Sequence, residues 1–311
     1  MNANHAAHTL MRNVHMNFSQ LQSFVAVADT GSFTEAAYAL DMTQSAVSHA
    51  LSALEGELGV TLLERNRKSV VALTAVGQAI IPRVRTLLAQ REAIKQEAKA
   101  AQGETAGKLR LGSMLSLVSP DLLARVLTRF RTLYPEVEIV LFEGMMREVG
   151  EWIEQSIVDV GFVLFPAPKF EVTPLITDEL CVLVPFGHRL HTKGAVMPGE
   201  LQEEGWILEK SPCAFQLLKA VLGPRRSRPQ LRYQASDSAT ILAMVREGLG
   251  ITLMPRLLLK KLEGIVALPL DPPYPLHIGL AVRSQAMTSP AARLLVQQAS
   301  IWVQESTFLL R

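Results

Sequence analysis

Residues 43–54 combine polar side chains on one face of a predicted helix with an apolar stripe on the other. Val47, Leu51 and Leu54 recur at spacings of four and three, which marks a buried helical face. Thr43 precedes the stripe and is a favourable N-cap. The outer face carries amide, hydroxyl and imidazole groups, which suit the DNA major groove because donors and acceptors there distinguish all four base pairs. The candidate DNA-contacting residues on this helix are Thr43, Gln44, Ser45, Ser48, His49 and Ser52.

A shorter helix and a tight corner are predicted directly before this one. Ser32 and Glu35 have the spacing of a capping box, and Asp41–Met42 form the corner. An earlier apolar stripe over 21–28 predicts a supporting helix. Two helices at an angle are common, and a Ser-rich face can simply be solvated. This segment alone therefore leaves both interpretations open.

A basic hairpin is predicted after the polar helix. The β-prone stretches 61–63 and 70–73 bracket three cations, Arg65, Arg67 and Lys68. Such side chains bind phosphates, which adds affinity independent of sequence and fixes the register on the duplex. A run of charge is otherwise most often solvated surface. Its position directly after the polar helix favours DNA contact.

One long helix is predicted from Thr74 to about Gln102. Its apolar positions are separated alternately by three and four residues, which is typical of a coiled-coil seam, although Arg91 occupies one of them. Pro82 should bend this helix or lie in its first turns. A face packed on the core of the same chain is the competing interpretation. The candidate dimerisation residues are Ile80, Val84, Leu87 and Ile94.

Beyond a polar hinge at 103–107, the pattern alternates between strands and helices, which predicts βαβ units and a mostly parallel sheet. The expected strands are 108–112, 138–142, 158–164, 180–184, 205–208, 231–234, 251–254 and 276–282. The expected helices are 116–133, 146–155, 215–221, 238–247 and 290–304.

Several motifs stand in the order and spacing of a known family. FVAVADTGSFTEAAYAL, TQSAVSHALSALEGELGVTLLER and LTAVG are followed by GKLRLGSMLSL, RFRTLYPEVEIVL, DELCVLVPFGHRL and MVREGLGITLMP. In this order they resemble the LysR-type transcriptional regulators, and the resemblance covers roughly residues 16–305. An ordered series of matches is far more specific than any one motif.

The resemblance implies an N-terminal all-α winged helix-turn-helix, a long linker helix that dimerises, and a C-terminal α/β two-lobed domain of the periplasmic-binding-protein type. The implied domains are 16–74, 75–102 and 107–305, after a disordered tail at 1–15. The implied lobes are 107–165 with 275–305, and 166–274. The chain would cross between the lobes near Phe165–Pro168 and again near Pro272–Leu276.

The same resemblance implies a sequence-specific regulator in the bacterial cytoplasm. Its implied partners are double-stranded DNA with an inverted-repeat operator, its own copy as a dimer or a dimer of dimers, and a small-molecule effector. RNA polymerase is a further possible partner. The effector identity, the operator sequence and the direction of regulation stay open.

A ligand site is expected between the lobes, at the carboxyl ends of strands and at helix N-termini that attract anions. Ser116 matches a family position whose hydroxyl contacts effectors. Met146 stands where some carboxylate-binding relatives carry a hydroxyl, and this departure favours a more apolar effector. Each candidate could instead be a helix cap or a packing residue. The candidate effector-binding residues are Ser113, Ser116, Met146, Ser211, Cys213 and Asp237.

Cysteine and histidine usage gives little support for redox or metal chemistry. Cys181 lies in an apolar run, whereas Cys213 falls at a predicted helix start, where a thiolate would be stabilised. The family's peroxide sensors pair cysteines that are closer in sequence than these two. His188 and His191 have no third ligand nearby, so a surface loop is favoured over zinc.

Composition limits the remaining classes. With 49% hydrophobic and 19% charged residues among 311, the chain is globular and long enough for two or three domains. No apolar run reaches the ~18–20 residues that cross a bilayer, and the first residues lack the apolar core of a secretory signal. A solute-binding protein would be expected to carry such a signal and to lack the basic hairpin. An enzyme would need a catalytic residue set, and none is found, so no catalysis, cofactor or metal is expected.

Overall fold

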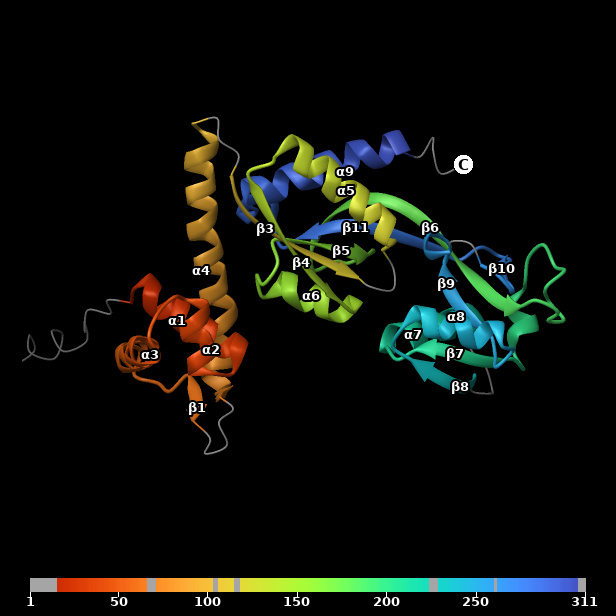
Figure 1. Cartoon of the computed structure of the whole chain (residues 1–311), viewed down its shortest axis with the longest axis horizontal. Coiled ribbons are helices and arrows are strands. Elements are labelled where there is room, and N and C mark those ends of the chain that lie inside the picture. The colour runs from red at the N-terminus through yellow and green to blue at the C-terminus, as the bar shows by residue number, and fades with distance from the viewer. Residues whose placement is uncertain are drawn as a thin grey trace, which may run out of the picture. The chain divides into compact units, whose positions relative to one another are not determined.

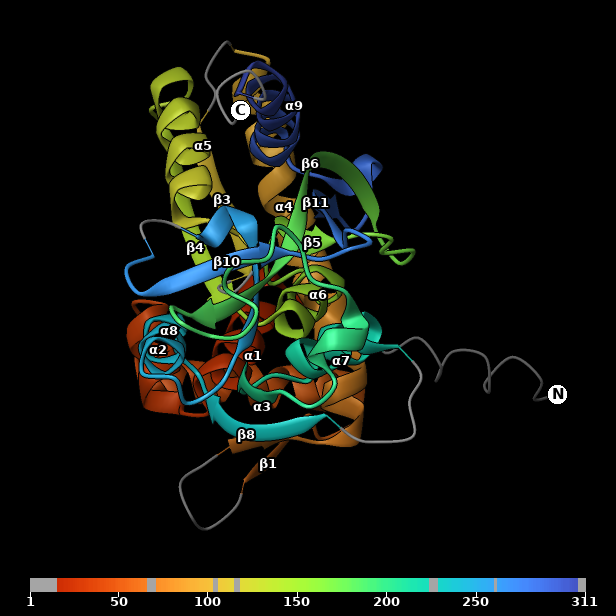
Figure 2. The ribbon, with the colours of Figure 1, turned by 90° about the vertical axis from the view of Figure 1, so that its right-hand side faces the viewer.

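The computed structural model describes residues 16–65, 71–102, 106–114, 118–223, 229–259 and 262–306. The chain divides into two compact units, Met1–Ala101 with Glu154–Ile157, and Gln102–Ile153 with Val158–Arg311. Figures 1 and 2 show their elements from two perpendicular directions. Among the described helices, none combines the length and the apolar composition that a bilayer crossing needs.

The N-terminal unit is a helix-turn-helix followed by a hairpin and a long helix. Its elements are α1 (Phe18–Thr30), α2 (Phe33–Ala39), α3 (Gln44–Leu58), β1 (Leu63–Arg65), β2 (Val71–Leu73) and α4 (Ala75–Ala100). The two short strands pair antiparallel, with Leu63 opposite Leu73. One apolar core, which includes Phe24, Leu51 and Leu62, joins the three short helices, the hairpin and the start of α4. The predicted winged helix-turn-helix is confirmed.

Local capping explains where these helices begin. Asn17 and Gln20 exchange hydrogen bonds between side chain and backbone, which forms a capping box at the start of α1. The hydroxyls of Ser32 and Thr43 each accept from the backbone N–H three residues later. The predicted N-caps of α2 and α3 are thereby confirmed.

The C-terminal unit begins with an α/β group of strands. β3 (Gly107–Met114) lies between β4 (Val137–Gly144) and β5 (Val160–Leu164) and pairs with both in parallel. In Figures 1 and 2, α5 and α9 lie on one side of these strands and α6 on the other. The helices are α5 (Pro120–Leu133), α6 (Met146–Glu154) and α9 (Pro290–Ser306).

A second group of strands follows in the same unit. β6 (Glu171–Pro185) carries β9 (Thr252–Pro255) and β10 (Ile265–Pro269) as antiparallel neighbours. β7 (Gly205–Glu209) pairs in parallel with β8 (Gln230–Ala235). Figure 1 shows α7 and α8 beside these two strands. The remaining elements are α7 (Pro212–Leu222), α8 (Ser238–Arg246) and the short 3-10 helices η1 (Pro198–Leu201), η2 (Arg256–Leu258) and η3 (Gln285–Met287).

The prediction of a mostly parallel sheet is wrong. The strand order is β10-β6-β11-β5-β3-β4, and only the pairings of β3 are parallel along this path. β11 (Pro275–Val282) lies antiparallel between β5 and β6. The alternation of strands and helices correctly predicts the βαβ elements. β11 joins the same sheet from a distant part of the sequence, and hydrophobic periodicity carries no information on such pairing.

The structure also moves one predicted crossing. Within β6, Glu171–Glu179 pair with β11, whereas Leu180–Pro185 pair with β9 or β10. The chain therefore passes between the two strand groups inside β6, near Asp178–Leu180, and not at Phe165–Pro168. It returns between β10 and β11. The helix expected at 116–133 begins at Pro120, because proline, which lacks an N–H, suits the first helical position.

Candidate functional site

Helix α3 presents the polar face that its sequence predicts. The side chains of Val47, Leu51 and Leu54 are 0% exposed and face the core of the N-terminal unit. On the other side, Ser48 is half-buried, and the exposed residues of the predicted set are Thr43, Gln44, Ser45, His49 and Ser52. The helix thus offers amide, hydroxyl and imidazole groups to a partner.

The corner before α3 fixes how this helix begins. Asp41 has a φ of 52°, a left-handed conformation that Asp tolerates better than most residues. Met42 N donates to the Ala37 carbonyl at 2.9 Å, which closes the corner. The Thr43 hydroxyl caps α3 and lies 3.0 Å from the hydroxyl of Ser45. Thr43 therefore has a structural role whether or not it contacts DNA.

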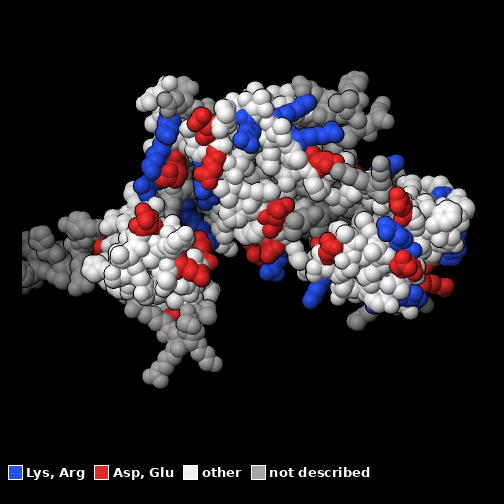
Figure 3. Space-filling view, in the orientation of Figure 1, with Lys and Arg blue, Asp and Glu red and all other residues white. Residues whose placement is uncertain are grey.

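The predicted cations of the hairpin are only partly described. Arg65 lies in β1 opposite Val71, while Arg67 and Lys68 fall outside the described residues. The base of the hairpin is tied to the turn after α1, because Val71 N donates to the Gly31 carbonyl at 3.1 Å. In Figure 3, the Lys and Arg side chains of this unit gather along α4 rather than over α2 and α3. The described surface of α3 therefore offers hydrogen-bonding groups more than positive charge.

Sequence reasoning missed Glu55 on the same helix. Its Oε1 accepts from the backbone N–H of Leu62 at 2.7 Å and from that of Leu63 at 3.3 Å. A second acid, Glu57, accepts from the side-chain amide of Gln20 on α1 at 2.9 Å. A lone glutamate on a helix is most often solvated, so its type and spacing gave no signal.

The predicted seam of α4 divides into two parts. Val84 is buried in the core of its own chain and Ile80 packs against that core, as the competing interpretation expects. Leu87 is 48% and Ile94 69% exposed. The guanidinium of Arg91 lies 4.7 Å from the centre of the ring of Phe18 on α1. Of the four candidate dimerisation residues, Leu87 and Ile94 are therefore exposed, Ile80 is half-buried and Val84 is buried.

Four of the six candidate effector residues form two pairs at strand ends, and a fifth, Cys213, lies in the first turn of α7. Ser113 is buried near the end of β3, and Met146 begins α6 directly after the neighbouring parallel strand β4. Ser211 and Asp237 follow the ends of the parallel neighbours β7 and β8. Carboxyl ends of adjacent parallel strands lie at one sheet edge, so each pair shares an edge. Ser116 lies outside the described residues.

In the second pair, capping is the observed role. The Ser211 hydroxyl accepts from Ala214 N at 3.1 Å at the start of α7. Asp237 caps α8 by accepting from the backbone N–H and the hydroxyl of Thr240, at 2.8 and 2.9 Å. These bonds lower the pKa of Asp237. Its negative charge already neutralises the N-terminus of α8, which disfavours an anionic ligand group there.

Both cysteines are poor thiolates. Burial raises the pKa of Cys181 to about 11. Burial also raises the pKa of Cys213, with a smaller contribution from Glu209. The expectation that the start of a helix would stabilise a Cys213 thiolate is therefore wrong, because desolvation outweighs the helix dipole.

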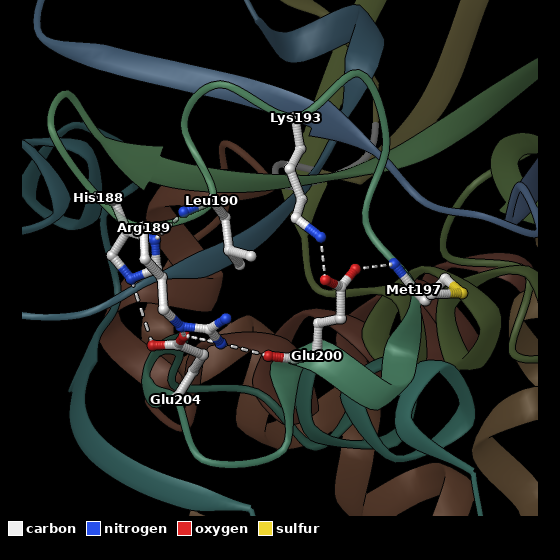
Figure 4. Close-up of polar contacts among 7 residues, drawn as sticks. All are labelled: His188, Arg189, Leu190, Lys193, Met197, Glu200 and Glu204. Carbon is white, nitrogen blue, oxygen red and sulfur yellow. Dashed lines mark hydrogen bonds and ion pairs between the residues drawn. The ribbon is translucent and has the colours of Figure 1, made fainter.

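One of the two loop histidines, His188, belongs to a network of ion pairs and hydrogen bonds, drawn in Figure 4. His188 Nδ1 accepts from Leu190 N at 3.3 Å, while Nε2 lies 3.3 Å from a Glu204 carboxylate oxygen that faces it. Arg189 Nε donates to the other oxygen of Glu204 at 2.9 Å. His191 contacts the His188 carbonyl through its ring. No cluster of three or more His, Cys, Asp or Glu that could hold a metal occurs among the described residues.

Comparisons with known proteins agree with this architecture. The family described as "Bacterial regulatory helix-turn-helix protein, lysR family" matches residues 18–78, and "LysR substrate binding domain" matches residues 102–302. The uncharacterized HTH-type transcriptional regulator YvbU of Bacillus subtilis is 34% identical over 293 residues, 91% of this chain and 98% of that protein. A probable hydrogen peroxide-inducible genes activator of Streptomyces viridosporus is 30% identical and covers 77% of each chain.

Solved structures share the fold. A full-length OxyR variant of Pseudomonas aeruginosa superposes with a TM-score of 0.74 at 23% identity, over 92% of this chain and 97% of that chain. CbnR in complex with its target DNA gives a TM-score of 0.58 at 21% identity, over 93% of this chain and all of that chain. With two family domains matched in order along the described architecture, the chain belongs to the LysR family of bacterial DNA-binding transcriptional regulators.

Proposed function

We propose that this regulator acts as a homodimer, reads an inverted-repeat operator through α3, and responds to a small molecule bound by its C-terminal unit. The observation that carries the proposal is the two-faced packing of α3. Val47, Leu51 and Leu54 are wholly buried, whereas the amide of Gln44, the imidazole of His49 and most of the hydroxyls are on exposed residues. That arrangement suits a recognition helix in the major groove.

Each part of the interface has a distinct proposed task. Gln44 pairs with an adenine edge, a bidentate contact worth about 1–3 kcal/mol of discrimination. The other exposed groups of α3 read neighbouring bases or bind water that does so. The cations Arg65, Arg67 and Lys68 neutralise phosphates, which adds affinity for every sequence alike.

Dimerisation through the outer part of α4 is supported by the exposure of Leu87 and Ile94, which lie seven residues apart. A symmetric dimer places two recognition helices at fixed spacing, which matches an inverted repeat. CbnR, which shares this architecture, was solved in complex with its target DNA, and this supports DNA binding here. A dimer of dimers and contact with RNA polymerase belong to the same proposal.

The effector is proposed to bind where the strand ends of the C-terminal unit carry Ser113 and Met146 in one lobe and Ser211 and Cys213 in the other. The lobes correspond to 107–165 with 275–305 and to 166–274, with the first boundary moved into β6. The thioether of Met146 and the charge of Asp237 favour a ligand with an apolar part and no anionic group at α8. Such a ligand controls DNA binding only through different affinities for two arrangements of the protein.

Selection of bound fragments from random duplexes tests the proposal directly. The full chain should enrich one two-fold symmetric site, whose half-sites lie about one helical turn or a multiple of it apart. Gln44→Ala should enrich a site that is degenerate at one symmetric pair of positions. Enrichment of no common site by the unaltered protein would contradict sequence-specific recognition.

A further inference from the structure

The backbone that leads from α3 into the hairpin is held from both sides. We call residues 61–73, which contain β1 and β2, the wing. On one side, Oε1 of Glu55 accepts from Leu62 N and Leu63 N at 2.7 and 3.3 Å. On the other side, the hydroxyl of Thr74 donates to the carbonyls of Thr61 and Leu62, at 2.8 and 3.2 Å. The first residues of the wing thus connect α3 to the N-cap of α4.

These contacts converge on Leu62. Its carbonyl also accepts from Thr74 N at 3.0 Å, and its side chain is 0% exposed in the core. Gly77 of α4 lies so close that an added Cβ would meet the Leu62 carbonyl oxygen at 2.2 Å. Leu62 therefore has little freedom to shift unless α3 or α4 shifts with it.

Helix stability does not explain the acid at position 55. A negative charge near the C-terminus of a helix is unfavourable, because the helix dipole is negative there. The described hydrogen bonds of the Glu55 side chain go instead to two backbone N–H groups that begin the wing. At 2.7 Å the bond to Leu62 N is short, and the two bonds to one carboxylate oxygen together orient the backbone at Leu62 and Leu63.

We propose that Glu55 is a positioning residue that fixes the wing relative to the recognition helix. Through Leu62 and Leu63 it holds β1 so that the cations of the wing reach phosphates while the polar face of α3 reaches bases. This inference rests on the proposed DNA-binding function. Glu55 would act only by fixing the geometry of the wing, whereas Gln44 and Arg67 would contact the DNA themselves.

Two variants of Glu55 separate geometry from charge. Glu55→Gln keeps the reach and one acceptor oxygen, whereas Glu55→Asp keeps the charge but withdraws the carboxylate by one methylene. We expect the Asp variant of the full chain to bind its operator with a shallower salt dependence. The logarithmic slope should fall by about 0.9 for each phosphate that is no longer neutralised. The Gln variant should retain the unaltered slope, and both should keep the preference among operator base variants.

Hydrogen exchange in the absence of DNA supplies an independent readout. The amides of Leu62 and Leu63 should exchange faster in the Asp variant and at nearly the unaltered rate in the Gln variant. Faster exchange with an unchanged salt slope would overturn the inference. So would a Gln variant that behaves like the Asp variant, since charge would then matter more than reach.

Arg67→Ala serves as the reference for the removal of one wing cation. If this variant leaves the salt slope unchanged while the amides of Leu62 and Leu63 still respond to Glu55→Asp, Arg67 does not bind a phosphate. That result would contradict the proposed role of the wing in DNA binding. It would also contradict the positioning role of Glu55, which depends on that binding. Misfolding of a variant would lower the DNA-competent fraction without changing the slope, and this outcome also contradicts the inference.

Discussion

Cys181 and Cys213 show how burial decides the chemistry of a side chain. Position in the sequence suggested a stabilised thiolate at Cys213, but desolvation raises the pKa of both thiols. Helix capping likewise accounts for two polar residues near strand ends, since Ser211 and Asp237 accept hydrogen bonds from the first turns of α7 and α8. The polar face of α3 could be predicted because helical periodicity alone defines it. The solvation of a single thiol depends on distant segments, which periodicity cannot supply.

The thiols should therefore react slowly in the folded protein. The thiolate is the reactive form, and with a pKa of about 11 roughly one Cys181 in a thousand is ionised at pH 8. A disulfide reagent at that pH should modify native protein much more slowly than urea-unfolded protein, and the rate should rise with pH. Single Cys181→Ser and Cys213→Ser variants show which thiol is modified at which rate. Rapid modification of native Cys181, or loss of DNA binding with mild peroxide, would contradict this account.

At the scale of elements, α4 and β6 each combine two environments that one sequence pattern cannot separate. The heptad spacing of α4 predicts one continuous seam. In the structure its first turns pack on their own chain through Ile81 and Val84, while Ile94 is exposed. In β6 the apolar half was predicted, whereas Glu171–Glu179 were missed because polar residues and a proline interrupt the pattern. β10 was missed as well, although strands as short as this one were predicted elsewhere.

A matched pair of substitutions in α4 tests this division. Ile81→Ala removes a buried side chain and should lower the free energy of unfolding of the N-terminal unit by about 2–5 kcal/mol. Ile94→Ala should leave that value nearly unchanged but weaken the dimer by about tenfold, the equivalent of ~1.4 kcal/mol. Hydrogen exchange of α1 and α3 amides reports the first effect, and sedimentation equilibrium reports the second. The reverse pattern would show that the dimer forms elsewhere.

At the scale of the whole molecule, the order of the motifs predicted the domain architecture. The alternation of strands and helices predicted the α/β character of the C-terminal unit. The two matched domains and the described units agree on a DNA-binding unit followed by a substrate-binding domain. The antiparallel return of β11 and the crossing inside β6 were not predicted, because both depend on pairing between segments about a hundred residues apart. The hydrogen-bond partners of the Glu55 carboxylate could not be predicted either. They lie only seven and eight residues further along the chain, but the contact also depends on how the chain folds back.

Net charge makes a prediction at this scale. The whole chain carries only +2, so its attraction to DNA must come from local cations. Affinity for operator DNA should still fall steeply with salt, because each neutralised phosphate releases counterions. With six or more such phosphates, affinity should fall about a thousandfold or more between 50 and 200 mM salt. A nearly flat response in a binding titration would exclude the wing as a phosphate-binding element.

The most direct measurement is the affinity of the unaltered protein and of Gln44→Ala for every single-base variant of the operator. If the polar face of α3 reads base edges, the substitution should abolish discrimination at one position in each half-site, by about 1–3 kcal/mol, and leave the other positions unchanged. An unchanged profile, or an equal loss of affinity at every position, would show that this face does not contact the bases.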